Sequence, residues 1–290
     1  MNFITNLIGG LSLGGIYAMI ALGYTMVYGI AKMLNFAHGD IIMVGGYTIL
    51  VFTAQSVHPL IAIALAVAFC VGLGVVVEKV AYKPLRGASP LAVLITAIGV
   101  SYLLQSLAQM FFGSGTKMVT GLDLGSFNIG LLKISVSTIV TLLSCIVVMV
   151  ALSLFVKYSK TGRAMIAVSE DKGAAQLMGI NVNFIIMITF AIGSALAALA
   201  GTFYLMRSPS IYSTFGSLPG IKAFAAAVIG GIGSIPGAML GGILLGVVEV
   251  FANSVSVIAP YTDAIEFAIL IVILLVKPTG FLGKKRREKV

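Results

Sequence analysis

The longest polar interruption in this chain is Lys157–Val182, KYSKTGRAMIAVSEDKGAAQLMGINV, which lies between two strongly apolar segments. We call it the 157–182 loop. Of the 290 residues in the chain, 59% are hydrophobic and only 9% are charged, whereas soluble domains are about 25% charged. This composition indicates that the lipid bilayer is the solvent. At roughly 20 residues per spanning helix, the chain has room for about eight to ten membrane spans.

The apolar segments predict an all-α integral membrane protein, a polytopic helical bundle formed as a single domain over residues 1–290. Residues Met1 to Ile30 carry no charged side chain, so we expect a retained first span there and not a cleaved signal peptide. The predicted spans are Leu7–Ile30, Ile41–Thr53, Leu60–Val80, Leu91–Phe112, Thr138–Val156, Phe184–Met206, Leu218–Gly233, Ala238–Val257 and Tyr261–Val276. The second, seventh and ninth are short for a full crossing. The longest connection, 113–137, is rich in glycine and is expected to be irregular.

The distribution of basic residues predicts the orientation of the chain in the membrane, because cytoplasmic loops carry an excess of Lys and Arg. One set of loops contains most of them, namely Lys32, Lys79, Lys83, Arg86, four residues of the 157–182 loop and the tail 277–290. With nine spans, we expect the N-terminus outside a bacterial-type inner membrane and the C-terminus in the cytoplasm. The tail is then an ordinary positive-inside anchor, and the net charge of +9 does not indicate nucleic-acid binding.

The sequence of the 157–182 loop predicts two short helices separated by a break. We expect Thr161 to cap the first helix and Ser169 to cap the second. Glu170 and Asp171 would lie in the first turn of the second helix, where the helix dipole favours negative charge. Gly179 is expected to end that helix.

The second helix would present a narrow face of Ala174, Ala175 and Met178. Such a face is too small to form a core but can fit into a groove of another protein. The alternative is an amphipathic loop that contacts only lipid headgroups. The pattern alone does not decide between them.

Three motifs, in the same order along the chain, resemble those of ABC-transporter permeases for branched-chain amino acids. The first is Leu34–Asp40, LNFAHGD, after the first span. The second is Gly162–Ile180 in the 157–182 loop, and the third is the glycine-rich Lys222–Glu249. Together they extend over essentially the whole chain, and they are most similar to the LivH type of subunit within the LivH/LivM family.

The resemblance implies that the 157–182 loop couples the spans to a cytosolic ATPase. The residues that would serve this coupling are Gly162, Arg163, Ala164, Ala167, Glu170, Asp171, Ala175 and Gly179. The chain contains no G-x-x-x-x-G-K-[ST] sequence, so no cofactor is expected in it, and ATP and Mg would bind to separate subunits. The implied partners are a second homologous permease, two cytosolic ATPase subunits and an extracytoplasmic substrate-binding protein. Import would proceed by alternating access.

A polar cluster at the start of the second span, together with the two residues that flank its members, is a candidate for the translocation pathway: the polar residues are Asn35, His38 and Asp40, and the flanking residues are Phe36 and Gly39. Unwound backbone is tolerated at membrane depth where it faces a cavity. The alternative is a polar turn between two spans, in which Asp40 caps the second helix. A metal site is not expected, because His58 is the only other histidine and both cysteines lie in apolar runs.

Two further features concern helix packing. Lys222 and Glu249 fall at similar depths in neighbouring spans, so we expect an intramembrane ion pair that lowers the cost of burying each charge. The small-x-x-x-small pairs are Gly10/Gly14, Gly237/Gly241 and Gly242/Gly246. They are expected to let helices approach closely.

Three alternatives to an amino acid importer remain at this point. A urea or short-amide permease of the same family has closely similar motifs. An ion-coupled secondary transporter would need acidic residues in several spans, whereas only Glu249 and Glu266 qualify. A membrane enzyme would need a metal-ligand cluster or a nucleophile with its base, and no such pattern is visible in the sequence.

Overall fold

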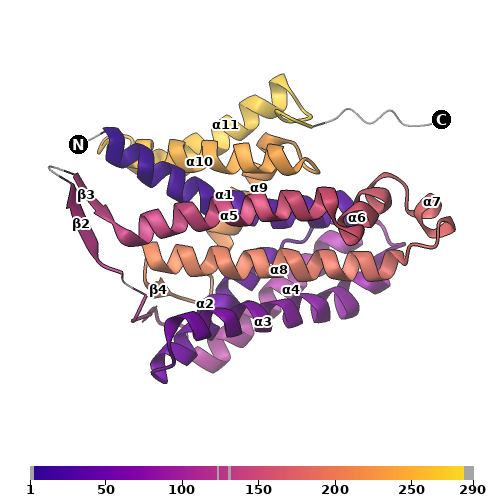
Figure 1. Ribbon diagram of the computed structural model, residues 1–290, viewed down its shortest axis with the longest axis horizontal. Coiled ribbons are helices and arrows are strands. Elements are labelled where there is room, and N and C mark those ends of the chain that lie inside the picture. Colours follow the sequence, from indigo (N-terminus) through magenta and orange to yellow (C-terminus); the bar gives the residue numbers. More distant parts are fainter. Residues whose placement is uncertain (1–2, 123, 130–131, 284–290) are drawn as a thin grey trace.

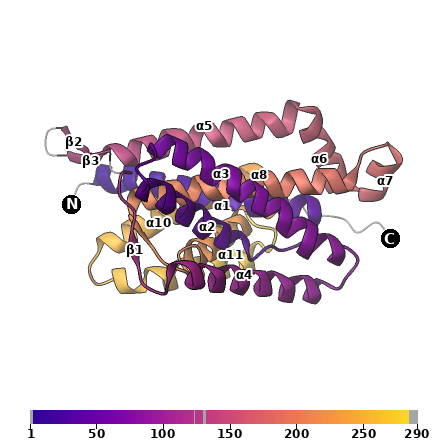
Figure 2. The same cartoon turned by 90° about the horizontal axis from the view of Figure 1, so that it is seen from below.

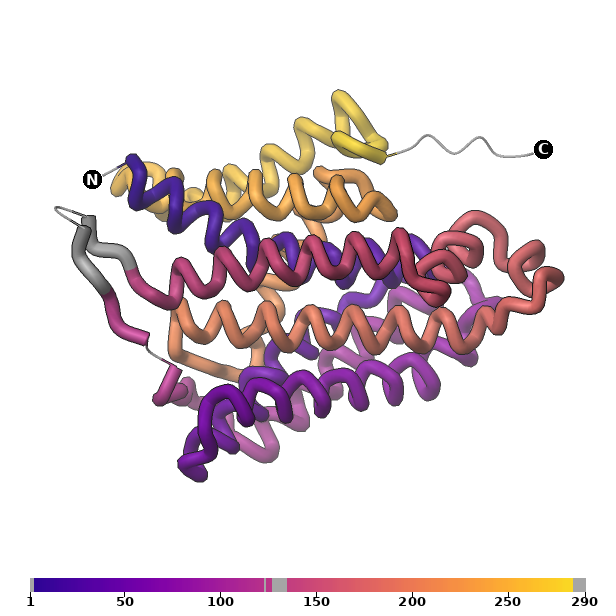
Figure 3. Tube along the Cα trace, viewed as in Figure 1, coloured from indigo at the N-terminus to yellow at the C-terminus, as the bar shows by residue number. Residues whose placement is uncertain are grey.

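The computed structural model describes residues 3–122, 124–129 and 132–283. Most helices run along the long axis of one bundle (Figure 1). The helices of the 157–182 loop lie at one end, and the hairpin of β2 (Ser126–Ile129) and β3 (Leu132–Ser135) lies at the other. The chain follows α5 (Val136–Tyr158) toward the end that holds the 157–182 loop. It turns there through α6 (Lys160–Glu170) and α7 (Lys172–Leu177), and it returns along α8 (Val182–Arg207) (Figure 3).

The α-helices are α1 (Phe3–Ala31), α2 (His38–Ala54), α3 (Pro59–Val77), α4 (Pro90–Phe112), α5 (Val136–Tyr158), α6 (Lys160–Glu170), α7 (Lys172–Leu177), α8 (Val182–Arg207), α9 (Ser217–Gly230), α10 (Ile235–Ser254) and α11 (Thr262–Val276). A π-helical turn, Glu78–Tyr82, and a 3-10 turn, Lys83–Leu85, extend α3, and a 3-10 turn, Ala259–Tyr261, precedes α11. The strands are β1 (Lys117–Met118), β2 (Ser126–Ile129), β3 (Leu132–Ser135) and β4 (Ser210–Ile211).

The predicted helical bundle is confirmed, and each predicted span coincides with a helix to within a few residues. Seven helices in the described residues are long and apolar enough to cross a membrane, and α2 and α9 are shorter apolar helices. The 14 residues of α9 extend only about 21 Å at 1.5 Å per residue, less than the hydrocarbon thickness of about 30 Å. The seventh predicted span, Leu218–Gly233, was expected to be short for a full crossing, and the helix found there is shorter still.

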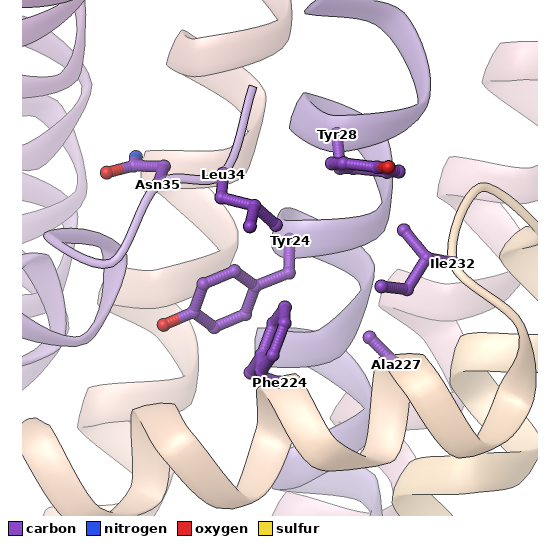
Figure 4. Close-up of a pocket in the computed structure, with 7 residues that line it drawn as sticks. All are labelled: Tyr24, Tyr28, Leu34, Asn35, Phe224, Ala227 and Ile232. Carbon is purple, nitrogen blue, oxygen red and sulfur yellow. The ribbon is translucent and has the colours of Figure 1, made fainter. Parts of the chain in front are cut away.

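The two short helices begin at the same place inside the bundle. A Cβ atom on Gly39 would lie 2.6 Å from the carbonyl oxygen of Gly216, and one on Gly220 would lie 2.9 Å from Gly39 Cα. Only glycines permit so close an approach of the two backbones. The first turns of α2 and α9 are thus adjacent, and α9 then crosses α1 at a steep angle (Figure 4).

Helix α1 forms the centre of the bundle and is buried along most of its length. Its closest packing is with α10, where a Cβ on Gly14 would lie 2.7 Å from Ile243 Cα and one on Gly246 would overlap the Gly14 backbone. Gly237 and Gly241 similarly approach the backbone of α9. The predicted role of the glycine pairs in close helix packing is confirmed. Helices α4 and α5 lie on opposite flanks (Figure 2), and both expose large apolar side chains.

The expectation of an irregular 113–137 connection is wrong only in part: residues 113–116, 119–122 and 124–125 are irregular, whereas other residues of the connection form strands. β2 and β3 pair antiparallel, with Ser126 opposite Ser135, and β1 pairs antiparallel with β4. The two glycine-free runs form the hairpin strands. Gly113, Gly121 and Gly125 lie outside those strands and take positive φ values of 80°, 85° and 77°, so they provide the bends.

Candidate functional site

A pocket lies where α1, the segment after it and α9 meet (Figure 4). Its lining residues are Tyr24, Tyr28, Leu34, Asn35, Phe224, Ala227 and Ile232. The ring centroids of Tyr24 and Phe224 are 5.7 Å apart, and Phe36 packs on the same phenylalanine at 5.5 Å. Of the predicted pathway residues, Asn35 therefore lines this pocket, and Phe36 packs against its lining residue Phe224.

A hydrogen bond positions Asn35. The hydroxyl of Tyr82 donates to Asn35 Oδ1 at 2.8 Å, and both side chains are buried. Tyr82 ends the π-helical turn after α3, and such turns occur frequently at functional sites. Glu78 begins the same turn and pairs with Arg86. Tyr82, Glu78 and Arg86 were not assigned to a site from the sequence, because the sequence of this turn cannot be distinguished from the ordinary end of an apolar span.

His38 is enclosed between α1 and α2. Its side chain is buried, its ring meets Tyr24 edge-on with 4.7 Å between centroids, and a Cβ on Gly23 would overlap it. No group of three or more His, Cys, Asp and Glu residues in the described part of the chain could hold a metal ion. The structure thus places His38 in a closed packing contact and not on an open surface.

Asp40 links α2 to α4. Its Oδ1 accepts a hydrogen bond at 2.8 Å from Gln105 Nε2, which also donates to Ser101 Oγ and Ser217 Oγ at 3.2 Å each. Ser217 is the first residue of α9, so one amide side chain joins the first turns of both short helices. The alternative in which Asp40 caps α2 is not what the structure contains, because Ala37 occupies the cap position without a side-chain cap bond.

The polar face of α4 was missed in the sequence. Ser101, Gln105 and Gln109 recur every four residues, a spacing that puts them on one side of a helix. Gln109 Nε2 donates to Ser213 Oγ at 3.1 Å, one turn from the Gln105 contacts. The signal that could have revealed this face is the regular spacing of polar residues inside an otherwise apolar span.

Lys222 is the centre of an ionic cluster formed by α1, α9, α10 and α11. Its Nζ lies 3.0 Å from Glu249 Oε2, 2.7 Å from Asp263 Oδ1 and 3.0 Å from Glu266 Oε2. The hydroxyl of Tyr17 donates to Glu249 Oε2 at 2.6 Å. We call these five residues the Lys222 cluster. The Lys222–Glu249 contact matches the predicted pair, whereas Tyr17, Asp263 and Glu266 were not assigned to it.

The 157–182 loop contains the two expected helices, but other residues cap them. Ser159 Oγ accepts from Gly162 N at 2.8 Å at the start of α6, and Asp171 Oδ1 accepts from Ala174 N at 3.0 Å at the start of α7. The predicted caps Thr161 and Ser169 are therefore wrong. Both lie within α6: Thr161 is two residues after the cap of α6, and Ser169 is two residues before the cap of α7. Gly179 follows α7 with φ of 80°, as expected for a helix stop.

The coupling candidates divide by their exposure. Arg163, Glu170, Asp171 and Gly179 are exposed, Ala164 and Ala167 are partly buried, and Gly162 and Ala175 are buried. Ala175 was expected to belong to the exposed narrow face of α7, and this prediction is wrong, since Ala175 is only 4% exposed. The apolar side chains at the tip are Leu177, 90% exposed, and Met178, 82% exposed.

Lys172 connects this loop to the centre of the bundle. Its Nζ donates a hydrogen bond at 2.8 Å to the carbonyl oxygen of Ala31, the last residue of α1. Partial burial, and then the nearby charge of Arg86, lower the pKa of the Lys172 amine. Only six residues separate Ala31 from the start of α2. The hydrogen bond from Lys172 therefore fixes the end of α1 just before the segment that contains the candidate pathway residues.

The basic tail is described only in part. Residues 277–283 fold back on the end of α9, where the amides of Phe281 and Leu282 donate to the carbonyls of Ile229 and Gly230. The remaining tail, 284–290, lies outside the described residues, so its predicted role as a membrane anchor stays a prediction.

Comparisons with known proteins agree over nearly the whole chain. A family model described as "Branched-chain amino acid transport system / permease component" matches residues 6–274. The chain is 44% identical to the high-affinity branched-chain amino acid transport system permease protein BraD of Pseudomonas aeruginosa, with 100% of this chain and 98% of that protein aligned. It is 41% identical to the corresponding protein LivH of Escherichia coli at the same coverage, and 27% identical to the Escherichia coli ribose import permease protein RbsC over 95% and 87% of the two chains. The chain therefore belongs to the family of branched-chain amino acid transport system permease components.

Proposed function

We propose that this permease subunit carries leucine, isoleucine and valine across the membrane by alternating access. The observation that carries this proposal is the full-length similarity to two relatives named for branched-chain amino acids, at 44% and 41% identity. It favours these cargoes over urea or short amides. Membership of an ABC permease family also removes the ion-coupled transporter and the membrane enzyme from consideration.

The route across the membrane passes the junction of α2 and α9. Two observations support this location. Both helices begin at the junction and direct their N-terminal amides into the bundle, as the discontinuous helices of other transporters do. The polar face of α4 lies against the same junction, and polar groups at membrane depth are costly unless they face a cavity or another protein. In this arrangement the aromatic contacts of Tyr24, Phe36 and Phe224 close the route.

The surface of the 157–182 loop supports an ATPase as one of the partners. The exposed apolar pair Leu177 and Met178 suits a groove in a cytosolic ATPase, which makes the end of the bundle that carries α6 and α7 cytoplasmic. Lys32 and Arg86 lie toward this side, which is cytoplasmic by the positive-inside rule, and the start of α1 is then outside. The complete importer would contain a second permease, two ATPases and an external binding protein.

Uptake of radiolabelled leucine tests the proposed function. The chain and its co-purifying partners are reconstituted into proteoliposomes with and without internal ATP and external binding protein. Uptake is expected only when both are present, with unlabelled valine and isoleucine competing and urea not competing. ATP-dependent uptake of urea without leucine would contradict the cargo. Leucine uptake that follows an imposed ion gradient and ignores ATP would contradict the mechanism.

Lys172 is expected to transmit loop movement to α1. Replacing Lys172 with Met keeps the length of the side chain but removes its donors, and a hydrogen bond from a charged group contributes about 1.5–3 kcal/mol. We therefore expect ATP-dependent uptake to fall about tenfold while the ATPase remains bound. The measurement is the ratio of leucine transported to ATP hydrolysed.

Two variants control this experiment. Lys172→Arg keeps a donor and should retain most of the transport, and Lys160→Met removes an exposed lysine from α6 of the same loop and should have no effect. An unchanged ratio in the Lys172→Met variant would contradict the transmitting role.

A further inference from the structure

The Lys222 cluster has an excess of negative charge inside the membrane domain. Three carboxylates contact one lysine amine, and no other Lys or Arg among the described residues forms an ion pair with them. Lys222 is only 4% exposed and Glu266 only 1% exposed. A buried carboxylate that lacks its own counter-charge is so costly that the group normally becomes neutral. If all four charged groups were ionised, the cluster would carry two uncompensated negative charges.

Its geometry brings two of these carboxylates close together. Glu249 Oε2 and Glu266 Oε2 each lie 3.0 Å from Lys222 Nζ, so the two oxygens cannot be more than twice that distance apart. Like charges at this separation disfavour the ionised form of one partner. All three carboxylates lie within 3.0 Å of the same ammonium group, but the Lys222–Glu266 contact is an ion pair in which neither Glu266 oxygen accepts a hydrogen bond from the described part of the chain.

The surroundings differ between the three acids. Glu249 accepts a further hydrogen bond, from the Tyr17 hydroxyl, and its side chain is 15% exposed. The side chain of Asp263 is 54% exposed and is therefore solvated. Both carboxylate oxygens of Glu266, in contrast, are buried and have no hydrogen-bond partner in the described part of the chain. Glu266 is thus the acid that has least to stabilise a negative charge.

We propose that the Lys222 cluster is a proton-binding site in which Glu266 is held as a neutral carboxylic acid. With this one proton, the buried part of the cluster is balanced, because Lys222 pairs with Glu249 and the remaining charge is on the solvated Asp263. A metal cation or a second ammonium group would have to lie beside the Lys222 ammonium, which repels it. A proton removes a negative charge without adding a separate positive centre.

The site would make the packing of four helices depend on pH. The other titratable groups of the cluster come from every helix packed around Glu266: Tyr17 of α1, Lys222 of α9, Glu249 of α10 and, on the same helix as Glu266, Asp263. Tyr204 of α8 also interacts electrostatically with Glu249 and Lys222. Because the folded protein would bind this proton more tightly than the unfolded chain does, its stability falls as pH rises through the titration of the site. This inference is independent of the identity of the cargo.

Infrared spectroscopy of the purified full-length chain tests the proposal, since a neutral carboxylic acid has a C=O stretching band separate from the bands of carboxylates. We expect the band at neutral pH in the wild type and its loss in Glu266→Gln. It should also be lost in Glu249→Gln, because Lys222 can then pair with an ionised Glu266. It should persist in Asp263→Asn.

Thermal unfolding gives a second readout. The midpoint of the wild type should fall as pH is raised, and the midpoint of Glu266→Gln, which mimics the neutral acid, should lose this dependence. Absence of the band in the wild type overturns the proposal. So does persistence of the band in Glu266→Gln together with its loss in Asp40→Asn, which would assign the proton to Asp40, a different buried acid. A Glu266→Gln protein that does not fold overturns it as well, because a neutral isostere would then be incompatible with the site.

Discussion

Replacing both Leu177 and Met178 with Ser is expected to abolish ATP-dependent uptake by preventing the ATPase from binding. The two side chains are 90% and 82% exposed at the end of α7, so their replacement removes no contact within this chain. Burying a Leu or Met side chain in an interface contributes about 1.5–3 kcal/mol. Loss of two such contacts should weaken ATPase binding about 100-fold or more. The measurement is co-purification of the ATPase with the tagged permease, followed by uptake.

A matched pair of residues separates this effect from a general loss of exposed apolar surface. Leu275 and Val276, at the end of α11, are 79% and 81% exposed. The variant with Ser at both positions should bind the ATPase as the wild type does. Equal ATPase binding by the wild type and the Leu177→Ser, Met178→Ser variant would show that the tip of α7 is not the docking element. In that case the loop would contact only lipid headgroups, the alternative that the sequence left open.

The sequence predicts the helices of this protein well because each span is a long apolar run bounded by proline, glycine or polar residues. Pro59 and Pro90 occupy the first helical positions of α3 and α4, and Gly113 follows the end of α4. The glycine pairs of α1 and α10 were recognisable for a similar reason, since their spacing alone places them on one helix face. These features are local in the sequence, so no knowledge of the tertiary structure is needed to find them.

Features that depend on how helices are oriented were not predictable. Hydropathy indicates that Ser217–Gly230 is apolar, but it contains no information on tilt, so the crossing of α9 over α1 was missed. The additional acids of the Lys222 cluster lie some 40 residues along the chain from the lysine, and only the fold brings them together. The caps of α6 and α7 were misplaced by two residues because several good cap formers follow one another there.

Candidate site residues show the same limit. The sequence singled out Asn35 and Asp40 correctly as polar groups within the bundle, but their partners Tyr82 and Gln105 lie on other helices. A polar residue in an apolar segment can be identified locally, whereas its hydrogen-bond partner cannot. Whether these residues contact a transported amino acid stays a prediction.

Substituting Gly246 with Leu is expected to prevent the bundle from assembling. A Cβ at this position would overlap the backbone of Gly14, and backbone atoms of a buried helix cannot move aside as the end of a flexible side chain can. Overpacking a core generally costs about 1–3 kcal/mol, and more where no side chain can rearrange. Helix α1 contacts α5, α8, α9 and α10, so separating it from α10 disturbs the whole centre of the bundle.

The measurement is the thermal midpoint of the detergent-solubilised protein, followed by size-exclusion chromatography, together with its yield. Gly72→Leu is the matched control, because Gly72 lies in a spanning helix, α3, and a Cβ there would meet nothing within 4 Å. It should be purified in normal yield with an unchanged midpoint. Gly246→Ala should give an intermediate loss, since it introduces the overlap with the smallest side chain. If the Gly246→Leu protein were as stable as the Gly72→Leu protein, α1 and α10 would not be in backbone contact. The arrangement of these two helices that positions Tyr17 beside Glu249 would then be wrong as well.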